Sequence, residues 1–145
     1  GGLISGLSIA LKSHWDNLNI HPVEPEFWDD TKISLKEKKR HIIINKKSSI
    51  CDALLSETPG ELTFRINKEL LSFGISVTDK QVMEAIHIAY KYLKLVLEPG
   101  GAVAIAAALN CSEIVNNKKV LVILSGGNID KEIFLNSLKT KIPKM

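Results

Sequence analysis

Two glycines, Gly1 and Gly2, open the 145-residue sequence and run directly into an apolar stretch of helical periodicity. Glycines at the start of a helix leave backbone N–H groups accessible, and the helix dipole favours an anion at that end. A phosphate group would suit this position. Glycine turns also occur for purely steric reasons, so the pattern alone leaves both interpretations open.

An acidic stretch, VEPEFWDD at residues 23–30, combines carboxylates with a tight turn. Glu24 closes an expected strand, and Asp29 and Asp30 fall in the first turn of an expected helix. Carboxylates there stabilise the helix dipole, which is the simpler interpretation. The alternative is a site for a hard cation, in which Glu24 and one aspartate supply carboxylate oxygens and the turn supplies a backbone carbonyl.

Two further glycine-containing turns, EPGG at 98–101 and SGGN at 125–128, follow predicted elements. SGGN comes after a continuous apolar run, so the Ser125 hydroxyl is expected at the carboxyl edge of a sheet, where it could meet a ring nitrogen or a phosphate. A nucleophilic serine is not favoured, because no GxSxG elbow surrounds it. Capping of the strand end is the structural alternative.

Alternating strands and helices are expected to position these turns. Strand-like stretches around 19–26, 42–44, 75–78 and 119–124 alternate with helix-like stretches at 3–11, 26–37, 48–55, 60–73, 79–97 and 102–109. Thr78 and Gln81 form a capping box, and EPGG is expected to end the helix that the box begins. The order predicts an α/β fold with a mostly parallel sheet and helices on both faces, in which ligands bind beyond the carboxyl ends of the strands.

The composition is that of one globular domain, with 45% hydrophobic and 24% charged residues in 16.0 kDa. The apolar runs are too short to cross a bilayer and no signal peptide opens the chain, so we expect a cytoplasmic location without a membrane partner. Lysines around residues 42–44 give most of the net charge of +3. We interpret them as a solvated rim, and no aromatic residues interleave with them, so no nucleic-acid partner is expected.

Five stretches taken in order resemble the pyridoxal-phosphate enzymes of the threonine dehydratase and serine racemase family: GGLISGLSIALK, VEPEFWDD, SICDALLSETPGELTF, LVLEPGGAVAIAAAL and VLVILSGGNID. The resemblance covers essentially the whole chain. It implies fold type II, as in the tryptophan synthase β subunit, with pyridoxal phosphate in a cleft between two α/β domains. Residues 1–145 then correspond to the C-terminal part of the large domain, without its N-terminal part and without the small domain.

The resemblance also implies roles for single residues toward pyridoxal 5'-phosphate. Gly1 and Gly2 match the last two glycines of the family's tetraglycine phosphate loop, and Leu3 matches the residue after it. Glu98 matches a glutamate near the cofactor ring, and Ser125 matches the serine that bonds the pyridine nitrogen. A neutral hydroxyl partner leaves that nitrogen unprotonated, which suits β-elimination better than transamination.

A divalent-cation site is implied by the same resemblance. Glu24, the backbone carbonyl of Trp28 and Asp30 match the ligands of the metal-dependent family members. The ion would be Mg²⁺, Mn²⁺ or Ca²⁺, which are hard ions suited to oxygen ligands.

The sequence also departs from the family pattern. The SxKxRGA and SxGNHA segments do not occur, so we assign no Schiff-base lysine or other catalytic residue here, expect that lysine upstream, and expect this chain alone to be inactive. Ala53 replaces a common glycine and Pro22 interrupts a strand, which leaves the subfamily open. We expect no feedback regulation through an ACT-type domain after SGGN.

These observations lead to one main hypothesis about function. The chain is expected to be the C-terminal part of a threonine/serine ammonia-lyase, or dehydratase, that converts L-threonine or L-serine to a 2-oxo acid and ammonia. Serine racemase and a dehydratase acting on hydroxyaspartate or a hydroxyectoine breakdown product remain alternatives, as does a non-catalytic ligand-binding α/β module. We expect a small hydroxyamino acid as substrate and a homodimer or higher homo-oligomer for the intact protein.

Overall fold

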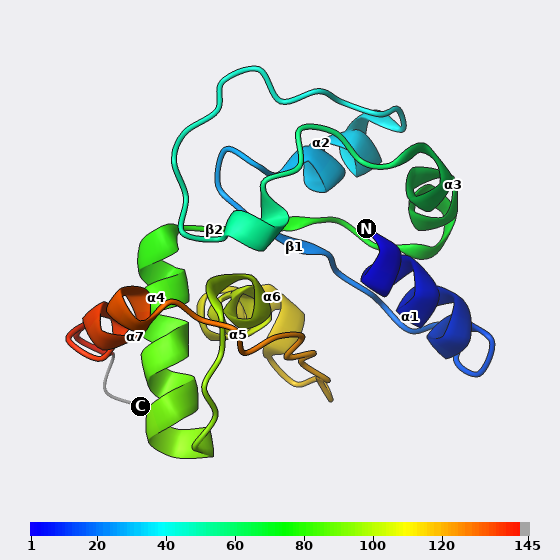
Figure 1. Cartoon of the computed structure of the whole chain (residues 1–145). Coiled ribbons are helices and arrows are strands. Elements are labelled where there is room, and N and C mark those ends of the chain that lie inside the picture. The colour runs from blue at the N-terminus through cyan, green and yellow to red at the C-terminus, as the bar shows by residue number, and fades with distance from the viewer. Residues whose placement is uncertain (143–145) are drawn as a thin grey trace. The chain divides into compact units, whose positions relative to one another are not determined.

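The computed structural model describes residues 1–142 and divides the chain into two compact units (Figure 1). The first unit comprises Gly1–Lys47 and Ser56–Ser76, and the second comprises Ser48–Leu55 and the chain from Val77 onward. Each unit has buried side chains of its own, so each is described by itself.

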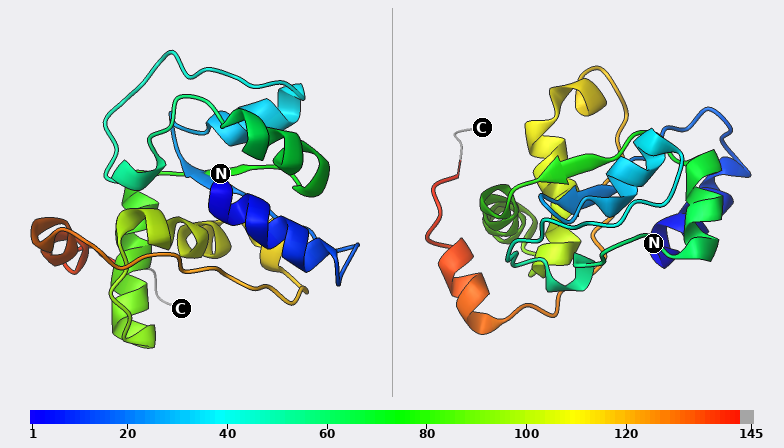
Figure 2. Two further views of the ribbon diagram at one scale, coloured as in Figure 1. Left: turned by 45° about the vertical axis from the view of Figure 1, so that its right-hand side comes forward. Right: turned by 90° about the horizontal axis from the view of Figure 1, so that it is seen from above.

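The first unit contains a small parallel sheet flanked by helices. Its elements are α1 (Gly2–Lys12), β1 (Val23–Pro25), α2 (Asp30–Glu37), α3 (Glu61–Leu70) and the start of β2 (Ile75–Val77). The two strands lie side by side (Figure 2). Around them, Ser72 N–H donates to Ile20 O at 2.8 Å and Ile75 N–H donates to Pro22 O at 2.9 Å. From the first bond to the second, the donor and the acceptor both advance along the chain, which is the pattern of parallel strands. This parallel pair confirms the α/β prediction.

Small side chains allow α1 to pack closely on α3. Ser5 is buried on α1 and its hydroxyl donates to Oδ1 of the buried Asn67 on α3 at 2.8 Å. This bond satisfies polar atoms that would otherwise be buried without a partner. Residues 3–11 form a helix as predicted, and that helix begins at Gly2.

The second unit is built around two packed helices, α4 (Asp79–Ile88) and α5 (Pro99–Asn110). A π-helical turn (Ala89–Leu93) continues α4, and η1 (Asp52–Leu54), α6 (Ser112–Val115) and α7 (Lys131–Ser137) complete the unit. The interface consists of fully buried small and aliphatic side chains, among them Val82, Ala85, Ile86, Ala102 and Ala106. The sequence pattern predicts a buried stripe at Val82, Ala85, Ile86, Ala89, Tyr90, Leu93 and Val96 or Leu97. The first four and Leu97 are buried, whereas Tyr90 and Leu93 are 43% and 53% exposed, because the α-helical period ends at Ile88 and a π-helical turn follows.

The predicted capping box at the start of α4 is confirmed. Thr78 Oγ1 accepts from Gln81 N–H at 3.1 Å, and Gln81 Oε1 accepts from Thr78 N–H at 2.8 Å. Each bond satisfies an N–H group that the helix itself leaves without an acceptor.

Several predicted helix boundaries were wrong, because the backbone leaves the helical conformation at other residues than the pattern indicates, and of the helix expected over 48–55 only Asp52–Leu54 is helical. The helix expected from residue 26 begins at Asp30, because Phe27 adopts φ 67° and closes a turn before it. The helix expected to reach Gly74 ends at Leu70. EPGG does not end the helix before it: that helix stops at Lys94 with φ 61°, and Glu98 is the N-cap of α5 with a proline in its first turn.

Two predicted extended stretches do not form strands. Residues 119–124 make no backbone hydrogen bond to any other segment of residues 1–142, and residues 42–44 make one, from Ile43 N–H to Glu57 O. Leu121 is 75% exposed and Ile123 is 39% exposed, whereas Val122 and Leu124 are less exposed. This alternation is that of an extended chain with one covered face. It lacks a neighbouring strand to bond among the described residues, which is why no strand results.

None of the helices formed by residues 1–142 is both long enough and apolar enough to span a membrane.

Candidate cofactor and cation sites

The N-terminus of α1, where the sequence predicted a phosphate, is open to an anion. No side chain caps this helix and its first turn carries no acidic residue. The N–H groups of Gly2, Leu3 and Ile4 donate to no acceptor within the described residues. A Cβ added to Gly2 would meet no other described atom within 4 Å, so the approach is unobstructed. Free N–H groups at the positive end of an eleven-residue helix fit a phosphate.

In the second unit, the EPGG and SGGN turns are held together by Glu98. Its backbone N–H donates to Gly126 O at 3.1 Å, and its carboxylate accepts from Asn128 N–H at 3.1 Å. Sequence reasoning placed Glu98 and Ser125 in one site, and the structure brings the turns that carry them into direct contact.

The glycines of these turns are required by close approach rather than by unusual backbone angles. A Cβ on Gly101 would lie 2.6 Å from Gly126 O, and a Cβ on Gly127 would lie 2.8 Å from Val96 O. A Cβ on Gly126 would overlap the Glu98 carboxylate. At Gly101 and Gly127 the nearby atoms are backbone, so a Cβ does not fit there, whereas a Cβ on Gly126 requires the Glu98 carboxylate to move.

Ser125 stands on this rigid turn with a free hydroxyl. The residue is exposed, and its Oγ forms no hydrogen bond within the described residues. A hydroxyl both donates and accepts, so it is available to a ring nitrogen of a ligand. The structural alternative, in which Ser125 caps the end of a strand, has no hydrogen bond to support it.

The candidate cation ligands of the first unit gather around the start of α2. Glu24 is buried, and its two carboxylate oxygens accept from Thr31 N–H at 2.9 Å and from Lys32 N–H at 2.8 Å. Asp30 is also buried and interacts with Glu24. The turn between them holds Trp28, whose Nε1 donates to Lys47 O at 2.7 Å.

Burial places these two carboxyl groups in an electrostatically unfavourable position. It raises the pKa of Glu24 to about 8, and repulsion from Asp30 acts in the same direction, while the hydrogen bonds from Thr31 and Lys32 oppose the change. Burial likewise raises the pKa of Asp30 above its ordinary value. Two neighbouring buried carboxylates are stabilised when a cation compensates their charge. Two carboxylates and a backbone carbonyl are oxygen donors of the kind that a hard divalent ion takes, so the chemistry of these residues fits such an ion.

Within residues 1–142, no group of three or more histidine, cysteine, aspartate or glutamate side chains is arranged to hold a metal. The candidate site has two such side chains, and it needs the Trp28 carbonyl to provide a third protein ligand.

Sequence reasoning did not single out Asp79, which anchors the segment before η1. Its Oδ1 accepts from Ser49 Oγ at 2.6 Å and its Oδ2 accepts from Ile50 N–H at 3.0 Å. The anchored segment leads to Ala53, which lies against Gly100 of α5. If Gly100 carried a Cβ, that atom would lie 3.4 Å from the Cβ of Ala53. An aspartate in the first turn of a helix is usually explained by the helix dipole, so local sequence carries no signal for this longer-range role.

Comparison with known proteins identifies the family. Residues 1–126 match the family model described as pyridoxal-phosphate dependent enzyme. The chain belongs to the pyridoxal-phosphate-dependent enzyme family. It is 35% identical over 130 residues to L-threonine ammonia-lyase of Thermotoga maritima, covering 90% of this chain and 32% of that protein. It is 38% identical over 134 residues to serine racemase of Dictyostelium discoideum, covering 90% of this chain and 41% of that protein.

Solved structures of this pyridoxal-phosphate family share the fold. The processed form of threonine deaminase isoform 2 from Solanum lycopersicum superposes with a TM-score of 0.85 at 32% identity, over 94% of this chain and 38% of that one. The chain thus spans between about a third and two-fifths of the length of these relatives. The fold is that of fold type II pyridoxal-phosphate enzymes, and the resemblance inferred from the five sequence stretches is confirmed.

Proposed function

We propose that the protein is a pyridoxal-phosphate-dependent ammonia-lyase that converts L-threonine or L-serine to a 2-oxo acid and ammonia. The observation that carries this proposal is the free hydroxyl of Ser125, held on a turn that Glu98 and three glycines make rigid. Pyridoxal phosphate supplies an electron-withdrawing ring that stabilises negative charge at the substrate α-carbon. A neutral partner at the ring nitrogen suits elimination.

In this proposal each group of residues has a separate task. The N–H groups of Gly1, Gly2 and Leu3 bind the phosphate through the open N-terminus of α1. The Ser125 hydroxyl bonds the ring nitrogen without transferring a full proton to it, and Glu98 holds the turn on which Ser125 stands. The lysine that carries the cofactor is expected outside these 145 residues, because no lysine here stands in the family's SxKxRGA context.

A divalent cation is proposed to bind Glu24, the Trp28 carbonyl and Asp30. Support comes from the two neighbouring buried carboxyl groups: burial raises the pKa of both, and a bound cation would favour their ionised forms. The ion would stabilise the first unit at the start of α2 and lies in no step of the reaction.

Residues 1–145 are proposed to be the C-terminal part of the large domain of this enzyme, which we expect to be a cytoplasmic homodimer or higher homo-oligomer. The oligomeric state is measured by light scattering after size-exclusion chromatography of the full-length protein. A monomer that is fully active would contradict this part of the proposal.

The test uses the full-length protein that contains this chain, loaded with pyridoxal phosphate. We expect 2-oxobutyrate from L-threonine and pyruvate from L-serine. Replacing Ser125 with Asp should protonate the ring nitrogen and reduce elimination at least tenfold while the cofactor stays bound, and Ser125→Ala should weaken cofactor binding. Ser13→Ala is the matched control, because Ser13 is exposed and bonds only its own helix and His14.

Serine racemase is the second candidate, favoured by the 38% identity to the Dictyostelium discoideum enzyme. Chiral chromatography of the same reactions distinguishes the two. Formation of D-serine faster than pyruvate would establish racemisation as the main reaction. Absence of both products, with no absorbance from bound cofactor, would favour a non-catalytic binding module.

A further inference from the structure

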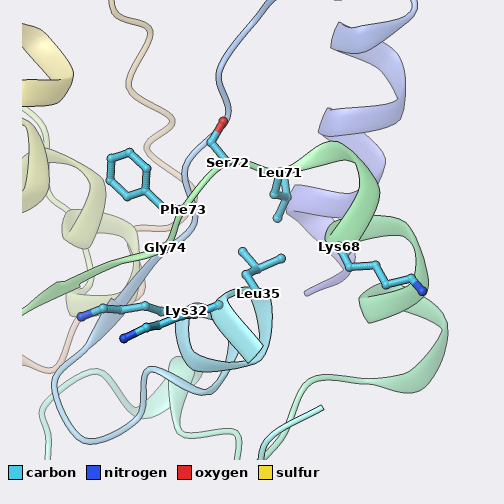
Figure 3. Close-up of a pocket in the computed structure, with 8 residues that line it drawn as sticks. Lys32, Leu35, Lys68, Leu71, Ser72, Phe73 and Gly74 are labelled. Atoms are coloured by element: carbon cyan, nitrogen blue, oxygen red, sulfur yellow. The ribbon is translucent and has the colours of Figure 1, made fainter. Parts of the chain in front are cut away.

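A groove with an apolar floor and lysines around it lies between α2 and α3 in the first unit (Figure 3). Leu35 from α2 and Leu71 from the end of α3 point toward each other across it, and Phe73 lies to one side. Its volume is about 510 Å³. Sites for small organic ligands usually have volumes of roughly 300–1,000 Å³. The groove is therefore large enough for a small molecule.

Close backbone packing forms one wall of this groove. A Cβ on Gly74 would lie 2.6 Å from the Lys32 Cα, so α2 sits directly against the backbone that follows α3. The Phe73 ring packs against His21 in a tilted arrangement with ring centroids 4.4 Å apart, and His21 Nδ1 lies 3.0 Å from Phe73 O. When the residues of a site already hold their bound positions, a ligand binds without a large entropic cost for ordering the protein.

All charged side chains that line the groove are lysines: Lys32, Lys36 and Lys68. Lys32 is already compensated, because its Nζ donates to Ser76 Oγ at 2.7 Å and lies 3.4 Å from Asp29 Oδ2. Lys36 forms no ion pair or hydrogen bond among the described residues, and Lys68 pairs only with the exposed Glu69, at 3.6 Å. Two positive charges at the rim thus lack strong partners.

We propose that this groove binds a small amphipathic organic anion. Its hydrocarbon body lies between Leu35 and Leu71, where water is displaced from apolar surface, and its carboxylate or phosphate lies at the rim, attracted by the positive charges of Lys36 and Lys68 on the two sides of the groove. The absence of carboxylates from the lining disfavours cationic and zwitterionic ligands. Lys32 borders both this groove and the Glu24 cluster, because its backbone N–H donates to Glu24, but Leu35, Leu71, Lys36 and Lys68 belong to neither the α1 N-terminus nor that cluster. The inference does not depend on the proposed catalytic function.

The test is calorimetric titration of the full-length protein with octanoate, with octylammonium as the matched cation of equal chain length. We expect saturable binding of octanoate that weakens as NaCl is raised, because salt screens exposed charges. Octylammonium is expected not to bind. Each of Lys36→Gln and Lys68→Gln should weaken binding about two- to fivefold, and the double variant about tenfold, as for exposed ion pairs.

Lys80→Gln is the control, since Lys80 is 84% exposed on α4 in the second unit and does not line the groove. It should leave octanoate affinity unchanged. Leu71→Glu, whose folding is checked by circular dichroism, should abolish binding by placing a negative charge in the apolar floor. No saturable binding of octanoate, equal affinity for octylammonium, or unchanged affinity in the double lysine variant would each overturn the proposal.

Discussion

Glu98 and Gly126 join two turns of the second unit so closely that a side chain on Gly126 fits only if the Glu98 carboxylate moves. The Glu98 backbone N–H donates to Gly126 O at 3.1 Å, and the Glu98 carboxylate fills the space where a side chain on Gly126 would lie. The carboxylate also accepts from Asn128 N–H. Ser125 is adjacent to this contact in the chain, so its orientation depends on it.

Gly126→Ala is expected to displace the SGGN turn and to weaken cofactor binding at least tenfold in the full-length protein. The new methyl group must push the Glu98 carboxylate away, and such overpacking usually costs about 1–3 kcal/mol. Cofactor affinity is measured from the visible absorbance of bound pyridoxal phosphate. Gly6→Ala is the control, because a Cβ there meets nothing within 4 Å. It should bind cofactor normally and be about 0.5–1 kcal/mol more stable, since alanine is favoured over glycine within a helix.

The buried pair of Glu24 and Asp30 predicts that stability falls with rising pH when no divalent cation is present. The pKa of Glu24 is raised from 4.5 to about 8 on folding. The folded state therefore binds the proton more tightly than the unfolded state between these values, and the resulting stabilisation is complete below pH 4.5 and lost as the pH approaches 8. The upper limit of the loss is about 5 kcal/mol.

Urea unfolding in the presence of a chelator, at pH 5 and at pH 8, measures this dependence. Glu24→Gln should flatten it, because an amide does not titrate. Excess Mg²⁺, Mn²⁺ or Ca²⁺ should restore stability at pH 8 more than at pH 5, since a cation binds only ionised carboxylates. A slope that is the same in Glu24→Gln and in the unmodified protein would contradict the assignment to Glu24.

Asp79→Ala is expected to release the segment before η1 without unfolding α4. Two hydrogen bonds to a charged acceptor are lost, from Ser49 Oγ and Ile50 N–H, and such bonds contribute about 1.5–3 kcal/mol each. Hydrogen exchange read by mass spectrometry should become faster in residues 48–55 and stay unchanged in α5. Asp79→Asn keeps one acceptor oxygen, so its exchange rate in residues 48–55 should lie between those of the unmodified protein and Asp79→Ala. Lys80→Ala, at the next position, should leave that exchange rate unchanged.

The capping box of α4 is expected to contribute about 1 kcal/mol to stability. Thr78→Ala removes the acceptor for Gln81 N–H and should lower the free energy of unfolding by about that amount, measured by urea titration. Gln81→Glu keeps an acceptor for Thr78 N–H and adds a negative charge near the helix N-terminus, so it should leave stability unchanged or raise it slightly. Equal losses in both variants would show that the box contributes through something other than these two bonds.

Features specified by neighbouring residues could be predicted from the sequence. The capping box at Thr78, the helix after Gly1 and the apolar face of α4 depend on residues a few positions apart, so one sequence contains the whole signal. The same holds for the glycine and serine motifs by which the chain resembles its family, because such turns need particular residues at particular places. The resemblance named the family correctly, but it did not assign a task to Asp79.

Only the tertiary structure decided which segments form hydrogen bonds and packing contacts with one another. Residues 119–124 have the apolar pattern of a buried strand, yet they form none, because a strand requires a neighbour to exchange hydrogen bonds with, and no segment of residues 1–142 provides one. Likewise, EPGG was expected to end one helix and instead begins another, where Glu98 meets the SGGN turn. Both outcomes depend on residues far apart in the chain. Local propensity carries no information about such contacts, whereas the packed structure fixes them through hydrogen bonds and exclusion of volume.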